Sequence, residues 1–490
     1  MALAPWLRSR FEVLITDRPR PRHAGLAAFL SFLFPGLGQA YAGDRRLGLV
    51  FATPALAVLV GLAVALTFLA DRLRNEFLST VFLGGLLAVN FALMAWRMAA
   101  IAQAAASART APAPRRRTRA VSTGVVAVLL AATVGMHAWA GVLIGRVNAT
   151  LEDVFAGGAP GGGGFEAEPL NQPDYRWDGT ERISFLLLGI DSGVGRTEAL
   201  TDTILVVSVD PVAGTAVMVS VPRDTGFVPL PDRSVYPDGV YPKKINELSS
   251  EAALSPGRWC PDLPPDGDAC GLRTLQRAIG LYVGVPIQYY ATVDLQGFVD
   301  LIDALGGVTL CLDGRLVDPE YGGPTWSGTG IELPAGCQHY DGRHALAYAR
   351  IRKGFLELPD GTREVQDDFK RAERQQRLLL QVRRDVAQAD LIFELPAILS
   401  AVGRTVKTDF PRSLAGDLAS LLPLVTGPDI ERSVLSYPEF VDPPIEPLVN
   451  YLLIPRRDDV RAEMERLFGT ALAGWYLGST ADGPPDGSTS

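Results

Sequence analysis

Four apolar runs in the first third of the chain constrain its fold more than any other feature. They cover residues 24–42, 47–70, 77–96 and 121–145, and each is close to the length of about 20 residues that crosses a bilayer as a helix. A chain of 490 residues also exceeds what one hydrophobic core usually fills. The sequence therefore predicts an α-helical transmembrane region followed by a separate folded domain.

Arginine residues orient the apolar runs. The segment before residue 23 is rich in arginine, and residues 97–120 contain six arginines and no acid. By the positive-inside rule, both segments are expected on the cytoplasmic side. Two segments on the same side enclose an even number of crossings, so one of the three runs between them does not span.

The run at 24–42 is the one that we expect not to span. The stretch Phe34-Pro35-Gly36-Leu37-Gly38-Gln39 interrupts it with a helix breaker, two glycines and an amide, which favours a re-entrant or interfacial segment. Residues 47–70 and 77–96 then form a hairpin, and the run at 121–145 leads outward. No short apolar stretch with a cleavage site opens the chain, so a cleavable signal peptide is not expected.

Charge differs between the two parts of the chain. Residues 1–146 contain 16 basic and 5 acidic residues, a net charge of +11, and the remainder carries −19. Because an acidic domain lacks the basic surface that nucleic acid requires, nucleic acid is not an expected partner. We predict a membrane region at 1–146 with three spans and one re-entrant or interfacial segment, a flexible Gly- and Pro-rich linker at 147–180, an extracytoplasmic domain at 181–470 and a largely disordered tail at 471–490.

All four cysteines, Cys260, Cys270, Cys311 and Cys337, lie after the last apolar run. An even number of cysteines in an exported domain favours disulfide bonds. We expect Cys260 to pair with Cys270 and Cys311 with Cys337, each around a loop rich in turn residues, while the other two pairings stay open. No Cys-x-x-Cys spacing supports a zinc site.

The second half of the chain has the pattern of a mixed α/β domain. Short Val-, Ile- and Leu-rich runs predict strands at 183–188, 203–209, 216–221, 288–293 and 308–312, with a hairpin at 210–214. Helical periodicity predicts helices at 271–283, 295–305, 364–389, 392–403, 413–425 and 456–468. This order predicts an α/β/α sandwich with a central mixed β-sheet.

Two aspartates flank the first two predicted strands. Asp191 follows the strand at 183–188, at the end where open α/β sheets place ligand-binding groups, and Asp202 lies just before the strand at 203–209. If these strands are neighbours, both carboxylates can share one Mg²⁺ ion that also contacts phosphate oxygens. A turn cap for Asp191 and a strand start for Asp202 explain the same residues without a ligand.

Cationic and amide side chains follow the third predicted strand. Arg223 comes after a proline that ends the strand, which directs the arginine toward the edge of the sheet. A local ion pair with Asp224 is the alternative. Lys244 and Asn246 are candidates for contacts with phosphate or sugar, while Asn246 also fits as the cap of a helix that begins at Glu247.

Arg350 and Arg352 alternate in the sequence. In an extended backbone both side chains leave the same face, and adjacent guanidinium groups repel each other unless an anion lies between them. This pair is the strongest single indication of a phosphate ligand, although partner carboxylates would also satisfy it.

A long predicted helix carries the last motif. Arg371 and Gln375 lie four residues apart and share a face, and Asp367 and Asp368 come shortly before them. Either acid is a candidate general base toward an incoming hydroxyl, and surface ion pairs with Arg371 are the alternative. Arg374 faces elsewhere on the helix and is expected to be solvated.

Taken in this order, the motifs resemble the LytR-CpsA-Psr family of cell-wall glycopolymer transferases. The resemblance covers about residues 182–385, and its motifs include Leu188-Gly189-Ile190-Asp191, Ser220-Val221-Pro222-Arg223-Asp224 and Ala345-Leu346-Ala347-Tyr348-Ala349-Arg350. It implies a membrane-anchored bacterial enzyme that moves a glycopolymer phosphate from a polyprenyl-pyrophosphate carrier to a sugar hydroxyl of peptidoglycan. It also implies Mg²⁺, an α/β/α fold and an apolar tunnel for the lipid tail.

The resemblance also assigns expected roles by motif position. Gly193 and Leu200 stand where relatives often have arginine, and Arg196 is a candidate substitute. The membrane region exceeds the single anchor typical of the family, and the extra hairpin is a candidate docking element. We expect catalytic roles for Arg223, Arg350, Arg352 and Asp368, substrate contacts from Lys244, Asn246, Arg371, Gln375 and Arg196, and metal binding by Asp191 and Asp202.

Three other functions fit parts of the sequence. A polyprenyl-pyrophosphate hydrolase would use the same groups with water as the acceptor. A membrane-bound transcription attenuator or regulator would need the acidic domain in the cytoplasm, which the arginine pattern opposes. A non-catalytic lipid- or glycan-binding module would tolerate the loss of Asp191 and Asp202.

Overall fold

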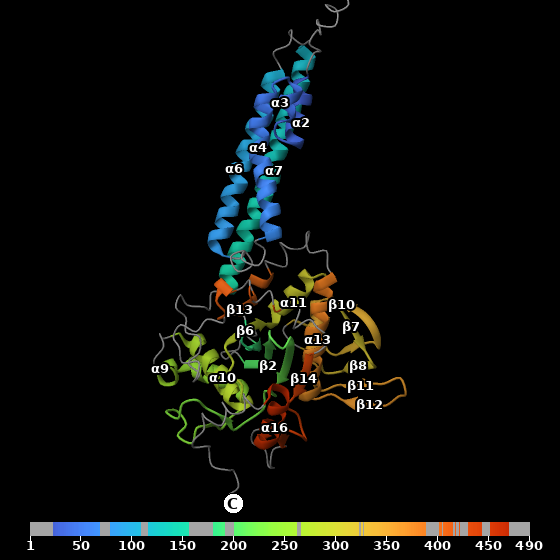
Figure 1. Cartoon of the computed structure of the whole chain (residues 1–490). Coiled ribbons are helices and arrows are strands. Elements are labelled where there is room, and N and C mark those ends of the chain that lie inside the picture. Colours follow the sequence, from blue (N-terminus) through green and yellow to red (C-terminus); the bar gives the residue numbers. More distant parts are fainter. Residues whose placement is uncertain are drawn as a thin grey trace, which may run out of the picture. The chain divides into compact units, whose positions relative to one another are not determined.

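The computed structural model divides the chain into two compact units, Met1–Asn148 and Ala149–Ser490. It describes residues 23–68, 79–108, 116–155, 180–191, 200–261, 266–322, 325, 326, 328–388, 401–403, 405–414, 417, 421, 430–442 and 451–469. The first unit is helical where it is described, and the second combines helices with strands (Figure 1).

The first unit contains α2 (Ala24–Leu33), α3 (Leu37–Tyr41), α4 (Arg45–Phe68), α6 (Thr80–Ser107) and most of α7 (Arg116–Val154). The break between α2 and α3 confirms the interruption predicted at the Phe-Pro-Gly sequence. Phe34 leaves the helix with an extended backbone, and Gly36 adopts a φ of 103°. Only glycine adopts this conformation readily. A Cβ atom at Gly36 would also lie 2.2 Å from the carbonyl oxygen of Gly48.

Small and amide side chains join α2 and α3 to α6. Ala27 and Ile101 are fully buried in one cluster. Ser31 Oγ donates to Gln39 Oε1 at 2.9 Å, and Gln39 Nε2 donates to the carbonyl oxygen of Ala100 at 2.9 Å. The amide of Gln39 is therefore satisfied inside the unit, as a polar group in an apolar helical region requires.

Two helices in the described part of the chain are long and apolar enough to cross a membrane, Thr80–Ser107 and Ala120–Val154. The run predicted at 47–70 forms α4, which is not one of these two, so a third span stays a prediction. α7 continues to Val154, so the linker does not begin at residue 147 as expected. The rest of the predicted linker, residues 156–179, lies outside the described residues.

A six-stranded mixed sheet forms the centre of the second unit. Its order is β13 (Val406–Thr408), β6 (Tyr289–Asp294), β1 (Ile183–Asp191), β2 (Leu200–Asp210), β3 (Thr215–Ser220) and β14 (Ile430–Val434). β1 is parallel to β6 and antiparallel to β2, and β3 is antiparallel to β2 and parallel to β14. The predicted hairpin is confirmed, because Asp210 Oδ1 accepts hydrogen bonds from the backbone nitrogens of Val212 and Ala213.

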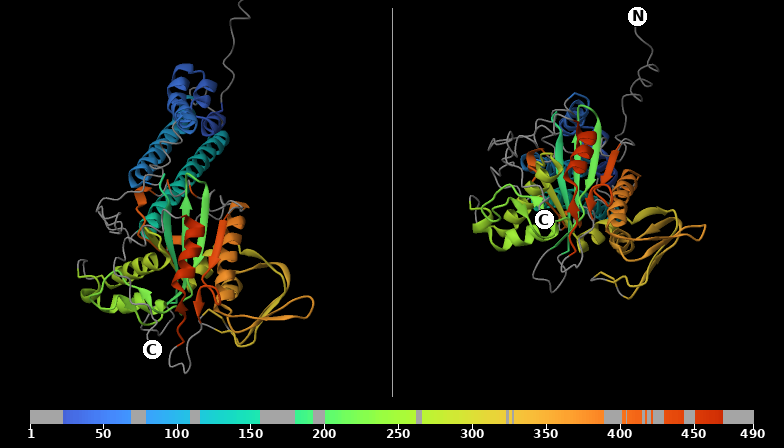
Figure 2. Two further views of the ribbon diagram at one scale, coloured as in Figure 1. Left: turned by 60° about the horizontal axis from the view of Figure 1, so that its bottom comes forward. Right: turned by 90° about the horizontal axis from the view of Figure 1, so that it is seen from below.

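Helices cover both faces of this sheet (Figure 2). On one face lie α8 (Ile245–Leu254), α10 (Gly267–Val283) and α16 (Arg457–Phe468), and on the other lies α13 (Asp368–Gln388). Val206 packs in the core with the first group, whereas Leu205 and Val207 lie in a cluster that contacts Leu380 of α13. This alternation follows from the two-residue period of a strand. Burial on both faces explains why the strands read as continuous apolar runs.

Smaller sheets complete the second unit. One has the order β12 (Arg363–Val365), β11 (Phe355–Glu357), β8 (Arg315–Asp318) and β9 (Ile331–Leu333), and β7 (Val308–Leu312) pairs with β10 (Gly336–Tyr340). They share a core with α11 (Leu295–Ala304) and α12 (Gly342–Arg350). The remaining short elements are β4 (Val228–Pro229), β5 (Val240–Tyr241), α9 (Pro256–Trp259), η2 (Arg412–Leu414), β15 (Val441–Asp442) and β16 (Ile454–Pro455).

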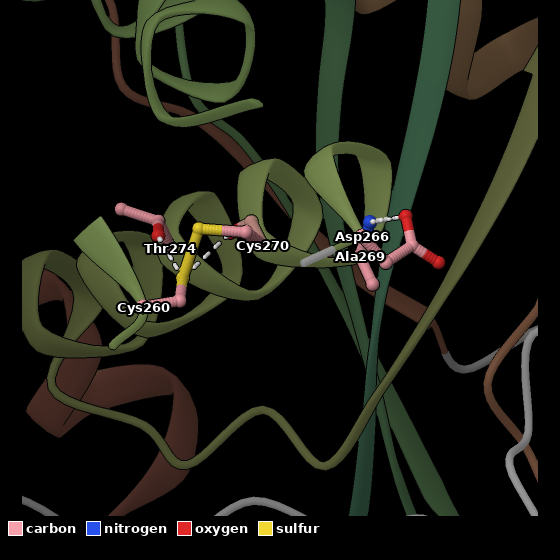
Figure 3. Close-up of a disulfide and its surroundings, with 5 residues drawn as sticks. All are labelled: Cys260, Asp266, Ala269, Cys270 and Thr274. Carbon is pink, nitrogen blue, oxygen red and sulfur yellow. Dashed lines mark hydrogen bonds between the residues drawn. A yellow bond between two sulfur atoms is a disulfide. The ribbon is translucent and has the colours of Figure 1, made fainter. Parts of the chain in front are cut away.

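Both expected disulfides are present. Cys260 is bonded to Cys270 at the start of α10, where Asp266 accepts a hydrogen bond from the backbone nitrogen of Ala269 (Figure 3). Cys311 is bonded to Cys337, its direct cross-strand partner on β7 and β10. No cysteine is free, since all four cysteines of the chain are in these two bonds.

The later predicted segments have different outcomes. The helix predicted at 364–389 begins later, at Asp368, because residues 363–365 pair with β11 as strand β12. Most of the helices predicted at 392–403 and 413–425 lie outside the described residues, and so does the predicted tail from 471. The helix predicted at 456–468 is confirmed as α16.

Candidate active site

The two predicted metal-binding carboxylates lie on neighbouring strands. Asp191 is buried at the end of β1, opposite Leu200 of β2. The pairing register shifts between Gly189 and Ile190, so Asp202 is the extra residue of a β-bulge in β2. Asp202 therefore lies inside the strand and not before it, which corrects the prediction. A bulge bends its strand and changes the direction of a side chain.

Arg223 lies among three carboxylates. Its Nη1 donates to Asp202 Oδ1 at 2.5 Å, and its Nε lies 3.4 Å from Asp368 Oδ2. The predicted local pair with Asp224 is much looser, at 4.0 Å. Burial lowers the pKa of the Arg223 guanidinium, but these carboxylates more than compensate and raise the pKa above its ordinary value. Arg223 therefore joins β2 to the start of α13.

The first turn of α13 adds a second arginine and the candidate base. Arg371 Nη2 donates to Asp368 Oδ2 and to the carbonyl oxygen of Asp202, each at 3.0 Å. Burial raises the pKa of Asp368 and lowers the pKa of Arg371. Asp367 is exposed and accepts a hydrogen bond from the backbone nitrogen of Lys370 at 2.8 Å. Of the two candidate bases, Asp368 lies in the charged cluster and Asp367 caps the helix.

Arg350 reaches the same region from α12. Its Nη2 donates to Asp191 Oδ2 at 3.2 Å. The prediction that Arg350 and Arg352 alternate along an extended strand is wrong, because α12 continues through Arg350 and Ile351 is the first residue beyond it. Arg352 is exposed after the helix ends. The two arginines thus reach the site from different backbone environments.

Arg374 is a functional candidate that the sequence analysis placed wrongly. It was expected to be solvated, but it is 6% exposed. Its Nε donates to the carbonyl oxygen of Tyr348 at 2.9 Å, and burial lowers its pKa to about 10. A sequence signal did exist, because Arg374 begins an i, i+4 series with Leu378 and Val382, both of which pack in the core.

Lys244 and Asn246 lie at the start of α8, beside Arg223. Lys244 Nζ donates to Asp224 Oδ1 at 2.8 Å. The helix begins at Ile245 with Lys244 in the capping position, so the alternative in which Asn246 caps a helix from Glu247 is wrong. The Asn246 side chain is buried, and its Oδ1 has no hydrogen-bond partner in the described part of the chain.

Two buried guanidinium nitrogens among the described residues of this site have no hydrogen-bond acceptor. Among the residues that the structure describes, Arg350 Nη1 and Arg371 Nε form no hydrogen bond. A buried N–H group without an acceptor is destabilising by about 1–3 kcal/mol, and more when the group is charged. Two such groups, on Arg350 and Arg371, are donors that a ligand with oxygen acceptors would satisfy.

An apolar pocket of about 250 Å³ is lined in part by Arg350 and Arg371. Its polar end is formed by Asp202, Arg350, Arg371 and Gln375. The rest of its lining is largely aliphatic and comes from β1, β2, β6, α11, α12 and α13, with Leu205, Val293, Phe298, Leu301, Leu346, Leu379 and Val382 among its residues. The pocket thus suits a molecule with an apolar tail and an anionic head.

The carboxylates fit a shared cation only if the ligand contributes to its coordination. No group of three or more His, Cys, Asp or Glu side chains in the described ranges is arranged to hold a metal ion. Asp191 and Asp202 on adjacent strands supply two carboxylates, the number that Mg²⁺ usually takes from a protein when phosphate oxygens supply more. Arg196 and Gly193 lie outside the described residues, and Leu200 is the first residue of β2.

Comparison with known proteins identifies the family of this chain. The model of the LytR_cpsA_psr family matches residues 166–438. A polyisoprenyl-teichoic acid–peptidoglycan teichoic acid transferase, TagU, of Enterococcus faecalis is 27% identical over 292 residues, which are 59% of this chain and 78% of the relative. TagU of Halalkalibacterium halodurans is 30% identical over 251 residues, 49% of this chain and 68% of the relative.

Two further proteins are similar over shorter or more distant matches. The cell wall biosynthesis protein LcpA of Corynebacterium glutamicum is 31% identical over 212 residues, 43% of this chain and 38% of the relative. The crystal structure of TagV from B. subtilis is 22% identical, with a TM-score of 0.44, over 60% of this chain and 98% of TagV. Because the family model matches more than half of the chain and spans every motif from Asp191 to Gln375, the chain belongs to the LytR_cpsA_psr family.

Proposed function

We propose that the chain is a membrane-anchored phosphotransferase that moves an anionic glycopolymer from a polyprenyl-pyrophosphate carrier to a hydroxyl group of peptidoglycan. The printed names of its relatives, a teichoic acid–peptidoglycan transferase and a cell wall biosynthesis protein, support this class of reaction. Family membership supports it as well, since the match covers all of the charged cluster.

One observation carries the proposal. An aliphatic pocket ends at buried guanidinium groups that have unused N–H donors. An isoprenoid chain fits the apolar part, and a diphosphate supplies the acceptors that the arginines lack, because guanidinium and phosphate form paired hydrogen bonds.

The charge of the cluster supports the participation of a divalent cation. Arg223, Lys244, Arg350 and Arg371 lie against Asp191, Asp202, Asp224 and Asp368. These groups are balanced, so a diphosphate would bring excess negative charge. We assign Mg²⁺ to Asp191 and Asp202, with phosphate oxygens as further ligands. When bound, the ion adds positive charge beside the phosphate oxygens on which negative charge develops.

The arrangement supports the following reaction step. The oxygen of the acceptor hydroxyl attacks the phosphorus that bears the glycopolymer, and the bond from that phosphorus to the bridging oxygen breaks. Polyprenyl phosphate leaves with the electron pair. Asp368 Oδ1 takes the hydroxyl proton, because the contacts of Asp368 with Arg223 and Arg371 both fall on Oδ2. Arg350 and Arg371 stabilise the charge on the leaving phosphate.

Removal of the divalent cation is expected to abolish transfer. Chelation should lower the rate of glycopolymer attachment by the full-length protein by at least about 10²-fold, and added Mg²⁺ should restore it, because the excess charge is then unneutralised. The assay follows lipid-linked glycopolymer with and without a peptidoglycan acceptor. Undiminished transfer after chelation contradicts the metal assignment, and equal phosphate release without acceptor favours the hydrolase.

The topology is part of the proposal. The arginine pattern supports a multi-pass protein with the domain after residue 146 outside the cytoplasm, and two disulfide bonds in that domain support an oxidising surrounding. Alkaline phosphatase fused at residue 300 should be active and fluorescent protein fused there dark, with fusions at residue 112 showing the reverse. A fluorescent fusion at residue 300 would contradict the topology and favour the transcription regulator.

A further inference from the structure

The C-terminal end of α12 lacks the usual means of termination. The last carbonyl oxygens of a helix have no partner inside the helix, and a glycine in left-handed conformation often follows and supplies one. Here Ile351 follows, with φ of −55° and ψ of 131°. Tyr348, Ala349 and Ile351 are all buried, so their carbonyl groups cannot turn to bulk solvent.

Side chains of α13 donate hydrogen bonds to these carbonyl oxygens. Arg374 Nε donates to the carbonyl oxygen of Tyr348 at 2.9 Å, and Arg374 Nη2 donates to the carbonyl oxygen of Ile351. Gln375 Nε2 donates to the carbonyl oxygen of Ala349 at 3.2 Å. The two carbonyls that Arg374 holds lie on either side of Arg350 in the sequence, so one guanidinium group brackets that residue.

Arg374 is not held as part of an ordinary ion pair. No carboxylate among the described residues forms a salt bridge with it, and its third contact is from Nη1 to the neutral Gln366 Oε1. A buried cation that meets only neutral acceptors is energetically costly. The negative end of the α12 dipole offsets part of that cost. Arg374 reaches these three acceptors from three separate nitrogens of a planar group, whereas the single nitrogen of a lysine cannot span the same positions.

We propose that Arg374 is a positioning residue for Arg350, whose guanidinium it holds in place through the backbone at the end of α12. Arg350 then keeps its contact with Asp191 and directs the unused Nη1 toward the phosphate. This role rests on the proposed function, since the phosphate is the ligand of Arg350 there. A misplacement of about 1 Å at a reacting centre lowers rates by about 10²-fold, so the position of this backbone matters.

Arg374→Lys in the full-length protein tests the role, and Arg377→Lys is the matched control. Arg377 lies one turn along α13, is about half exposed and lies 3.8 Å from Asp313. We expect Arg374→Lys to lower the affinity for inorganic pyrophosphate by about tenfold and glycopolymer transfer by about 10–100-fold. Amide hydrogen exchange at residues 347–352 should speed up. In the Arg377→Lys control, pyrophosphate affinity, transfer and amide exchange should each stay within about twofold of wild type.

A double-mutant cycle separates positioning from general support of the fold. In an Arg350→Ala background, Arg374→Lys should lower pyrophosphate affinity and transfer by less than about a further twofold, because the residue through which Arg374 acts is absent. Two outcomes would overturn the proposal: a double variant whose loss equals the product of the two single losses, or an Arg374→Lys variant with wild-type pyrophosphate binding and amide exchange. If Arg374→Lys does not fold, Gln366→Leu replaces it, because Gln366 accepts a hydrogen bond from the Arg374 guanidinium. Its loss of transfer should likewise disappear in the Arg350→Ala background. A wild-type protein that binds pyrophosphate without transferring glycopolymer contradicts the proposed function but leaves the binding and exchange tests intact.

Discussion

Arg350→Ala is expected to lower glycopolymer transfer by about 10³-fold, the size of effect that follows from removing an arginine that stabilises a transferring phosphate. Arg350 of α12 donates a hydrogen bond to Asp191 of β1, and its Nη1 is buried without an acceptor. The loss should appear mainly in the rate of transfer at saturating lipid substrate. It is measured as attachment of labelled glycopolymer to peptidoglycan by the purified full-length protein.

The controls separate chemistry from folding. Arg350→Ala leaves the buried Asp191 without this cation, which by itself destabilises a protein. Arg350→Lys keeps a positive charge beside Asp191 but lacks the second terminal nitrogen, so it should retain the fold and still lose more than about 30-fold in transfer. Arg343→Ala, on the exposed first turn of the same helix, should be within about twofold of wild type. Transfer near the wild-type rate in Arg350→Lys would contradict a specific role for the guanidinium.

Arg352 is the other arginine of the predicted pair. Because of its location, we expect Arg352→Ala to lower transfer less than Arg350→Ala does. It is exposed beyond the end of α12, whereas Arg350 lies in the network of buried charges. An exposed cation loses less hydration when it binds an anion, but its attraction to the anion is also weaker, because water screens the charge. The sequence treated the two arginines as equivalent, and the structure separates them.

The sequence alone predicted those elements of the fold that have a local signal in the chain. β1, β2 and β3 appear in it as apolar runs because they are covered on both faces, and the turn at Asp210 marks the hairpin between the second and third. The disulfide pairing that the structure shows is the one expected from the loops rich in turn residues, although the sequence left the other two pairings open. Each of these signals is local, so no knowledge of distant contacts was needed.

The parts that were missed depend on contacts between distant elements. The bulge that redirects Asp202 arises from a register shift against β1, which no property of β2 alone reveals. The extent of α12 depends on Arg374 and Gln375 of α13, which satisfy its last carbonyl groups. In both cases a polar group finds its partner across the fold, and local periodicity does not encode that partner.

Asp368→Asn is expected to lower transfer by about 10²–10⁴-fold, the usual contribution of a general base. Asn keeps the shape of the side chain and an oxygen that can accept from Arg371, so the contacts around it should survive. Burial raises the pKa of Asp368 above its ordinary value. Because the base acts only when it is deprotonated, activity should fall as pH decreases through that raised pKa. The acid limb of the wild-type profile should therefore lie at a higher pH than an exposed aspartate would give.

The pH profile distinguishes this role from charge pairing alone. The Asp368→Asn variant should retain a low rate that no longer falls on the acid side, since the titrating group has been removed. Asp367→Asn is the matched control, because Asp367 is exposed and caps α13 through the nitrogen of Lys370. It should keep the acid limb and lose at most a fewfold in rate. An unchanged acid limb in Asp368→Asn would mean that another group takes the proton, and Asp368 would then serve only to hold Arg223 and Arg371 together.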